Sequence, residues 1–435
     1  MTATTGRELR TMRWQIFAVT WLAYAGFYLC RKNWSVVMPI LMKDLGYTKM
    51  ELAGVLTGYL FIYMLGQFAN SVLSDRFGPR LIVGAGLIIS VCVNVAMGFT
   101  SALGLFMVLW CVNGYGQSTG WSGTIKNMAT WFQKKERGVV MGWWCTCYVL
   151  GGSFATIFAT YCATNNTILP GLGWKRAFWA PAIALFIIAL VYILLTRNKP
   201  SDAGFSDFPE DDKDKSSSDS SSSSLADQDS PSVLREVLSN PGIWITGIMY
   251  FFLKMTRYSF LFWLPVYMTE KLGYTVKQAG YTSSVYEFVG FLGVPIAGYA
   301  SDKLFRSRRF PVGSLMLFGL AIACLVQPQL ASFGLLGCAI GIAFIGIMTY
   351  GPDALMSAPA AMDMGSQRGA ATAAGVINGI GSCGPIFSPV IVAHFADPER
   401  LGWNGLFRLF AVCAVFGGVL LATKWNYGGQ RSDAA

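Results

Sequence analysis

The stretch WQIFAVTWLAYAGFYLCRKNWSVVMPIL, residues 14–41, decides the fold. As one helix it would rise about 40 Å, which is enough to cross a bilayer. Arg31 and Lys32 lie well past its midpoint, and the apolar run after them is too short to span a membrane alone. A cation at that depth costs about 2.5–3.5 kcal/mol unless it faces water or a counter-charge. Arg31 is therefore the first candidate for a functional site; the alternative is that both cations end a short helix by reaching lipid headgroups.

The whole chain has the composition of a membrane protein that crosses the bilayer many times. Of its 435 residues, 54% are hydrophobic and 13% are charged, whereas a soluble domain carries about 25% charged residues. The pattern predicts an all-α fold with twelve transmembrane helices. The expected spans are residues 14–41, 50–73, 80–99, 102–131, 138–161, 174–196, 241–268, 279–300, 311–331, 334–357, 369–394 and 404–424.

The net charge of +10 follows membrane topology and does not indicate nucleic-acid binding. Lys and Arg gather before the first span and after the even-numbered spans, so the clusters share one side of the membrane. The main members are Arg7, Arg10, Arg13, Arg76, Arg80, Lys134, Lys135, Arg137, Arg197, Lys199, Lys303, Arg306, Arg308, Arg309, Arg368, Lys424 and Arg431. This predicts cytoplasmic N- and C-termini in a bacterial inner membrane or an organelle membrane. The first span is too long for the core of a cleavable signal peptide.

A polar segment divides the chain into two halves. Residues 198–240 are acidic and Ser-rich, with SSSDSSSSS at 216–224. Such a segment cannot bury a core, so we expect a disordered cytoplasmic linker, with a phosphorylated regulatory segment as the alternative. The predicted domains are a six-helix bundle at 1–197 and a second six-helix bundle at 241–435.

The two halves carry the same landmarks in the same order. The pairs are Asp75-Arg76-x-Gly78 with Asp302-Lys303, Arg137-Gly138 with Arg368-Gly369, and Trp174 with Trp403, at offsets of 227, 231 and 229 residues. Landmarks at nearly one offset indicate a parallel duplication of a six-span unit.

The same offset leads from Arg31 to a second arginine inside a span. Arg257 lies 226 residues later, in the segment 241–268. In a parallel duplication the pseudo-twofold axis runs along the membrane normal, so equivalent residues face each other across a central cavity. We therefore expect the two arginines to form a pair at that cavity.

A pair of guanidinium groups suits a doubly charged anion. Each offers five donors in a planar fork that matches phosphate or carboxylate, and each stays protonated. Phosphate carries about −1.5 to −2 at neutral pH, so one phosphate neutralises the pair and a monocarboxylate neutralises half of it. Because an empty site of about +2 is costly to seal from water, reorientation should be fast only with a bound anion. This favours obligate exchange between inorganic phosphate and a phosphate ester.

Other residues within the spans complete the expected site, although an aromatic residue alone is more often packing than ligand. The expected substrate-binding residues besides the arginines are Lys32, Tyr24, Tyr28, Trp121, Lys126, Tyr148, Lys254 and Tyr258. Lys32 is expected to pair with a carboxylate, for which Glu287 is the candidate. The weaker candidates are Gln67, Asn113, Asp353 and Asn378. Asp75, Arg76, Asp302 and Lys303 are interpreted as gate residues that latch neighbouring helices.

Several other classes of function are disfavoured. There is no phosphate-cradling Walker loop and no arrangement of nucleophile and base, so we expect no enzyme, no metal and no cofactor. The ten cysteines lie almost wholly within spans and are interpreted as packing residues. Embedded carboxylates are few, which favours exchange over proton symport, although Glu287 keeps symport open. We expect a monomer whose partners are a phosphate ester, inorganic phosphate and the bilayer.

Several motifs resemble the major facilitator superfamily and, within it, the organophosphate:phosphate antiporter family. The Asp75 loop and its second copy resemble the superfamily signature. The motifs that resemble the antiporter family are Tyr28-Leu-Cys-Arg-Lys-Asn-Trp-Ser-Val-Val-Met-Pro39, Gly120-Trp121, Lys135-Glu-Arg-Gly138, Arg257-Tyr258, Tyr286-Glu287 and Tyr350-Gly-Pro352. The resemblance extends over nearly the whole chain, and it implies that Arg31 and Arg257 bind phosphate.

The resemblance also bears on the ester. Members that exchange glycerol 3-phosphate have His, Lys and Asp where this chain has Tyr148, Gln67 and Phe262, whereas residues 353–385 resemble sugar-phosphate exchangers. We therefore expect an antiporter that exchanges a hexose 6-phosphate, or else phosphoglycerate or a triose phosphate, for inorganic phosphate by alternating access. The alternatives are a membrane sensor of hexose phosphate that signals to a kinase partner, and a proton-coupled organic-anion symporter.

Overall fold

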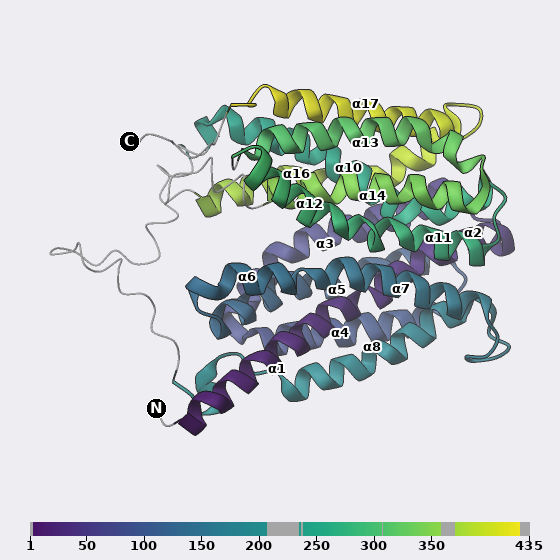
Figure 1. The fold of residues 1–435 in the computed structure, drawn as a ribbon. Helices are drawn as coiled ribbons and strands as arrows, with labels where there is room; N and C mark the ends of the chain where they lie inside the picture. Colours follow the sequence, from purple (N-terminus) through teal and green to yellow (C-terminus); the bar gives the residue numbers. More distant parts are fainter. Residues whose placement is uncertain (1–2, 207–234, 236–237, 307, 358–369, 427–435) are drawn as a thin grey trace. The chain divides into compact units, whose positions relative to one another are not determined.

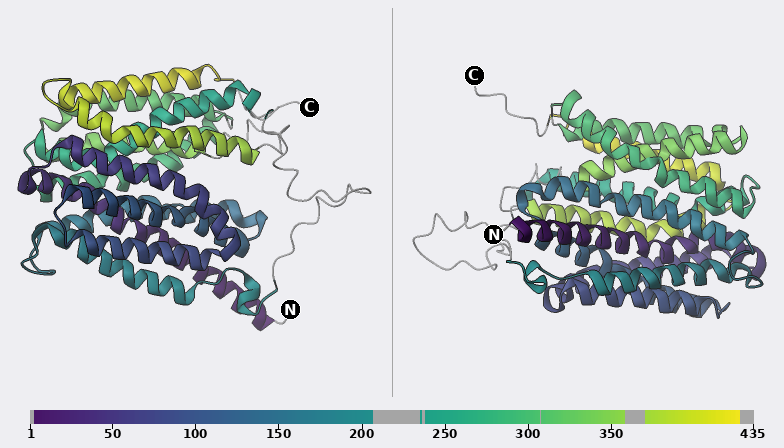
Figure 2. Two further views of the ribbon diagram at one scale, coloured as in Figure 1. Left: turned by 180° about the vertical axis from the view of Figure 1, so that it is seen from behind. Right: turned by 60° about the horizontal axis from the view of Figure 1, so that its bottom comes forward.

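The computed structural model describes residues 3–206, 235, 238–306, 308–357 and 370–426, and helices account for nearly all of them (Figure 1). The chain divides into two compact units, Met1–Asp219 and Ser220–Ala435. Further views show that the helices within each unit run side by side along one common direction (Figure 2). Each unit is described by itself.

The first unit contains six membrane-length segments. They are formed by α1 (Ala3–Phe27) with α2 (Leu29–Leu45), α3 (Lys49–Phe77), α4 (Pro79–Met97), α5 (Leu103–Trp131), α6 (Lys134–Trp144) with α7 (Thr146–Thr164), and α8 (Arg176–Leu195), which the short helix η1 (Gly173–Lys175) precedes. These bounds match the expected spans to within a few residues, except at the N-terminus, where α1 begins at Ala3.

The second unit also contains six such segments. They are formed by α10 (Pro241–Glu270), α11 (Val276–Phe288) with η5 (Gly290–Leu292), α12 (Gly293–Tyr299) and the π-helical turn η6 (Ala300–Leu304), α13 (Arg309–Ala331), α14 (Gly334–Ser357), α16 (Ala370–Phe395) and α17 (Gly402–Ala422). The predicted all-α fold of twelve segments is therefore confirmed in the described part of the chain.

Three segments that we expected as single helices are interrupted. The first breaks at Tyr28, because Cys30 has non-helical backbone angles (φ −100°, ψ 21°). The fifth divides at Cys145, and the eighth passes through the 3-10 turn η5 before α12 begins. The first segment is therefore two helices, where one helix was expected over 14–41, and the break lies directly before Arg31.

The helices pair in the same way in both units. In the first unit α7 packs on α2, α5 on α3, and α8 on α4. In the second unit the equivalent pairs are α10 with α16, α11 and α12 with α14, and α13 with α17. Equivalent segments therefore have equivalent neighbours, which supports the duplication inferred from the sequence.

The chain remains ordered beyond residue 197, where the disordered linker was expected to begin. The short helix η2 (Pro200–Ala203) follows α8. Asn198 accepts a hydrogen bond from the Arg80 backbone N–H (2.8 Å) and another, on its carbonyl, from the Thr130 hydroxyl (2.9 Å). The Ser-rich stretch at 216–224 lies outside the described residues.

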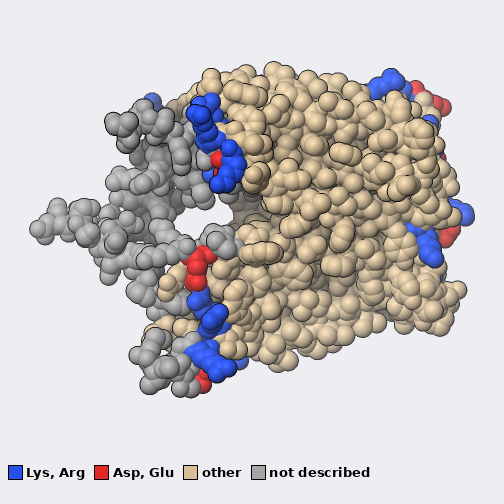
Figure 3. Space-filling model, in the orientation of Figure 1, with Lys and Arg blue, Asp and Glu red and all other residues tan. Residues whose placement is uncertain are grey.

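The surface separates charged from apolar residues. On the face drawn in Figure 3, Lys, Arg, Asp and Glu gather near the ends of the helices, and the broad surface between the ends carries none. Large apolar side chains are exposed in both units, for example Phe68 and Val72 on α3 and Phe344 on α14. Contiguous apolar surface of this kind is typical of contact with lipid.

Eight helices of the described chain are long and apolar enough to span a membrane by length and composition. The first, fourth, seventh and eighth segments fall short of that standard. Each of these four buries an ionisable or amide side chain, namely Arg31, Gln117, Lys254 and Glu287. Polar groups within the bundle lower the hydropathy of such segments, and the eighth is also divided into the short helices α11 and α12.

Gly114 allows α5 to approach α3 closely, so we predict that Gly114→Ala destabilises the fold. An added Cβ would lie 2.6 Å from the carbonyl oxygen of Tyr59, and such overpacking costs about 1–3 kcal/mol. Gly104→Ala on the same helix is the matched control, because its Cβ would meet nothing within 4 Å and alanine favours a helix over glycine by about 0.5–1 kcal/mol. Thermal unfolding of purified protein should give a lower Tm for Gly114→Ala only; an equal change in both variants would contradict this.

Candidate substrate-binding site

The break before Arg31 is held by two amide side chains of α5. A helix break leaves carbonyls without intrahelical donors. The Asn113 amide donates to the Cys30 carbonyl (2.8 Å), and the Gln117 amide donates to the carbonyl of Phe27 (2.9 Å) and, more weakly, of Cys30 (3.4 Å). The first segment can therefore bend inside an apolar bundle because its neighbour supplies the missing donors.

Gln117 also orients Arg31. The Arg31 Nε donates to the Gln117 Oε1 (3.1 Å), and the Arg31 side chain is buried. Its guanidinium carbon lies 4.6 Å from the ring centre of Tyr28 and 5.1 Å from that of Tyr63, distances at which a cation is attracted to a ring face. Within the described residues, Arg31 has no acidic partner, and its Nη2 is buried without a hydrogen bond.

Four residues predicted to bind substrate gather beside this arginine. Tyr24 lies 6.0 Å from Tyr28 and 5.3 Å from Trp121, measured between ring centres. Trp121 in turn lies 6.4 Å from Tyr148, and Trp144 closes the cluster against Tyr24 and Trp121. The structure thus brings Tyr24, Tyr28, Trp121 and Tyr148 into one aromatic cluster, to which α1, α5, α6 and α7 contribute.

The equivalent arginine in the second unit has an acidic partner. Arg257 Nη1 donates to the Asp353 Oδ2 on α14 at 2.8 Å, and the side chains are 12% and 7% exposed. The Tyr350 ring, one turn earlier on α14, lies 4.7 Å from the guanidinium carbon. The Asp353 carboxylate and the Tyr350 ring together orient Arg257 against α14. Gln117 and two tyrosine rings do the same for Arg31.

Lys254 lies one turn before Arg257 on α10 and is also buried. Its ammonium donates to the side chains of Asn378 (2.7 Å) and Ser382 (3.3 Å) on α16 and lies 4.5 Å from the ring centre of Tyr250. Lys254 occupies the position in the repeat that Tyr28 occupies in the first half, at the offset of 226 residues. The second half therefore adds one cation and one carboxylate around its arginine.

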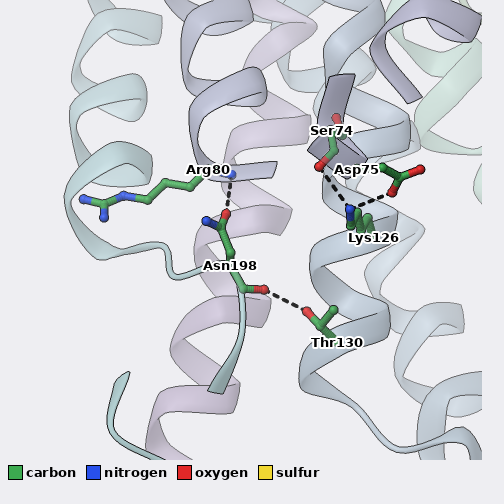
Figure 4. Close-up of polar contacts among 6 residues, drawn as sticks. All are labelled: Ser74, Asp75, Arg80, Lys126, Thr130 and Asn198. Atoms are coloured by element: carbon green, nitrogen blue, oxygen red, sulfur yellow. Dashed lines mark hydrogen bonds and ion pairs between the residues drawn. The ribbon is translucent and has the colours of Figure 1, made fainter. Parts of the chain in front are cut away.

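Lys126, which we predicted to bind substrate, lies elsewhere in the first unit (Figure 4). Its ammonium forms an ion pair with Asp75 (2.6 Å) and donates to the Ser74 carbonyl (3.0 Å) at the end of α3. Lys126 is nine residues beyond Gln117 on α5, which places it about 14 Å farther along the helix. This contact joins the ends of α3 and α5, and the roles of Lys126 in substrate binding and of Asp75 in gating stay predictions.

The turn after Asp75 is shaped by Gly78, which has a positive φ of +85°. A Cβ at Gly78 would lie 2.7 Å from the Asn198 side chain, so glycine allows Asn198 to reach the Arg80 backbone N–H (Figure 4). The other predicted gate residues, Arg76, Asp302 and Lys303, are exposed near the ends of their helices.

Other predicted residues are buried or half-buried but remain untested as ligands. Lys32 and Glu287 are both buried, in different units, and their pairing stays a prediction. Tyr258 is half-buried beside Arg257. Sequence reasoning missed Gln117 and Tyr63 altogether; the signal that could have identified Gln117 is an amide in the middle of an otherwise apolar span.

We predict that Gln117→Leu lowers both stability and phosphate affinity. The substitution removes the donor to the Phe27 carbonyl and the acceptor of Arg31, and unsatisfied buried groups cost about 1–3 kcal/mol each. Gln67→Leu on α3 is the control for stability, because the described structure gives that side chain no hydrogen bond. Equal Tm values for wild type and Gln117→Leu would contradict the assignment.

Lys126→Gln should leave the affinity for inorganic phosphate within about twofold of wild type. The ion pair with Asp75 is exposed on one side, and such pairs contribute only about 0–1 kcal/mol. Binding is measured by isothermal titration of the purified protein. A large loss of affinity would return Lys126 to the substrate site.

Comparison with known proteins agrees with this architecture. A model of the Major Facilitator Superfamily matches residues 20–374. A glycerol-3-phosphate transporter of Bacillus subtilis (strain 168) is 31% identical over 426 residues, which cover 96% of this chain and 94% of that protein. A probable hexose phosphate transport protein of Chlamydia trachomatis is 27% identical, with 98% and 93% covered. The membrane sensor protein UhpC of Escherichia coli (strain K12) is 25% identical, with 96% and 93% covered.

These relatives are membrane transporters and a sensor, so the family is not one of enzymes. They match this chain over almost its full length, and the motifs around Arg31, Arg257 and Tyr350 lie within the matched region. The expectation from the sequence motifs is confirmed. The chain is a multi-pass membrane protein that belongs to the Major Facilitator Superfamily and, within it, to the organophosphate:phosphate antiporter family.

Proposed function

We propose that this protein exchanges a phosphorylated sugar, hexose 6-phosphate in the first place, for inorganic phosphate by alternating access. Arg31 and Arg257 bind the phosphoryl group together, one from each half. The aromatic cluster of Tyr24, Tyr28, Trp121 and Tyr148 contacts the organic part. Both termini lie in the cytoplasm, where the Lys- and Arg-rich loops belong.

The buried Arg31 carries this proposal. It is held by a neutral amide and two aromatic rings rather than by a carboxylate in the described structure. A cation kept in an apolar bundle without a counter-charge is unfavourable, and a bound anion removes the cost. The guanidinium fork matches phosphate oxygens with paired hydrogen bonds.

The formal charges around the two arginines support a dianion. Asp353 neutralises Arg257, but Lys254 adds a cation one turn away, so each half has one positive charge in excess at its arginine. Lys32 and Glu287 add one charge of each sign and leave that excess unchanged. Phosphate and its monoesters carry about −1.5 to −2 at neutral pH and therefore balance the excess, whereas a monocarboxylate does not.

Charge balance also favours exchange over one-way transport. The empty carrier keeps its excess positive charge, and closing it away from water is costly. Inorganic phosphate and a phosphate ester present the same head group, so each can serve for one direction of the cycle. The carrier then reorients only when it is loaded.

The matched relatives and the aromatic cluster bear on the choice of ester. The matched relatives include proteins named for glycerol 3-phosphate and for hexose phosphate. Four aromatic side chains beside Arg31 provide a wide apolar surface, which suits a sugar ring better than a three-carbon chain. Hexose 6-phosphate therefore remains the preferred substrate.

Arg31→Lys and Arg257→Lys should each reduce phosphate exchange at least about tenfold. Lysine keeps the charge but loses the planar fork of donors that two phosphate oxygens require. The measurement is uptake of labelled phosphate by proteoliposomes that contain unlabelled phosphate. Arg408→Lys, at an exposed position of α17, is the matched control and should exchange as wild type does. Full exchange by either site variant would overturn the proposal.

A membrane sensor is the second candidate, because a relative with that name matches nearly the whole chain. A sensor would bind hexose phosphate through the same arginines but would exchange it slowly. Binding and exchange measured on one preparation separate the two functions. Tight binding of glucose 6-phosphate with negligible phosphate exchange by wild type would favour the sensor.

A further inference from the structure

Asp353 has one carboxylate oxygen that the protein uses and one that it does not. Oδ2 accepts the hydrogen bond from Arg257 at 2.8 Å. Oδ1 is buried and has no hydrogen-bond partner among the described residues. An unsatisfied buried acceptor is unfavourable and indicates a position where a donor from a ligand fits.

The equivalent contact in the first half leaves no such group. Gln117 lies on α5 as Asp353 lies on α14, the fourth segment of each half, and each contacts the arginine of its half. Both ends of the Gln117 amide are engaged, one by Arg31 and the other by the carbonyls of Phe27 and Cys30. The side chain that contacts Arg31 therefore has no open acceptor, whereas the side chain that contacts Arg257 has one, Asp353 Oδ1.

The chemistry of that acceptor defines what can bind beside it. An ionised carboxylate accepts hydrogen bonds and cannot donate them. A guanidinium has five donors, and the bond to Asp353 uses one of them. A phosphoryl group on the same guanidinium would place the adjoining carbons of its ester next to Asp353. A hydroxyl on those carbons can donate to Oδ1, whereas a carboxylate there would meet a like charge.

We propose that Asp353 determines specificity by accepting a hydrogen bond from a hydroxyl near the phosphate and by rejecting phosphate esters that carry a carboxylate. The inference rests on the proposed function, in which Arg257 binds the phosphoryl group. It assigns the substrate to the polyhydroxy phosphate esters, which include hexose and glycerol phosphates, and excludes phosphoglycerates.

Glycerol 3-phosphate and 3-phosphoglycerate are a matched pair of probes, because they differ only in a terminal hydroxymethyl or carboxylate group. n-Propyl phosphate has the same length and no hydroxyl. Affinities for the purified full-length protein are read from ligand-dependent tryptophan fluorescence and checked by the rise in Tm. The affinity for inorganic phosphate, which has no organic part, measures phosphoryl binding by the arginines separately from contacts to the organic part.

Wild type should bind glycerol 3-phosphate at least about tenfold more tightly than 3-phosphoglycerate, because juxtaposed like charges are strongly unfavourable, and more tightly than n-propyl phosphate. Asp353→Asn keeps an oxygen for Arg257 but removes the charge, so it should lower the preference for glycerol 3-phosphate over 3-phosphoglycerate at least about fivefold, mainly through tighter 3-phosphoglycerate binding. Asp202→Asn, at an exposed position of η2, should keep the wild-type preference.

Two outcomes would overturn the proposal. The first is a wild-type protein that binds 3-phosphoglycerate as tightly as glycerol 3-phosphate, which needs no variant to observe. The second is an Asp353→Asn protein that weakens inorganic phosphate and all three esters by one common factor, because Asp353 would then only orient Arg257. Phosphate binding that survives Arg257→Lys would instead refute the proposed function, and the wild-type preference would still decide the role of Asp353.

Discussion

A guanidinium inside a bundle of apolar helices requires acceptors or a counter-charge, and each half of this protein is arranged around that requirement. The first segment of each half supplies the arginine, and the fourth supplies the group that holds it. In the first half this group is the Gln117 amide, which also donates a hydrogen bond to the Phe27 carbonyl at the helix break before Arg31. In the second half it is the carboxylate of Asp353. Helix pairing within each half repeats in the same order, so one architecture supports both arginines.

Duplication and divergence together explain the chemistry. Duplication accounts for two buried cations at equivalent positions of the two halves. Divergence accounts for the acidic partner of Arg257 and for Lys254 where the first half has Tyr28. These two changes cancel in formal charge. Buried Lys32 in the first half and buried Glu287 in the second add further charges of opposite sign, so the halves differ both in charge and in hydrogen-bonding capacity.

Much of the fold was readable in the sequence because hydropathy and the repeat offset are local or periodic signals. Twelve segments and the depth of Arg31 and Arg257 followed from them. The break at Tyr28 did not, because it depends on donors from Asn113 and Gln117, which lie on another helix. The ion pair of Arg257 with Asp353 joins residues 96 positions apart, so only packing reveals it. Lys126 is a cation within a predicted span and therefore resembles a substrate ligand in the sequence. Its ion pair with Asp75 depends on how the ends of α3 and α5 pack, which the sequence does not reveal.

Both ends of the Gln117 amide form hydrogen bonds, and this limits which substitutions the first half can tolerate. Every polar atom of that side chain is hydrogen-bonded to the backbone or to Arg31. A substitution of Gln117 therefore also removes donors that stabilise the break in the first segment. The Asp353 side chain, in contrast, bonds to Arg257 and to no backbone group in the described structure. Substitutions that change which phosphate esters bind should therefore be tolerated better at Asp353 than at Gln117.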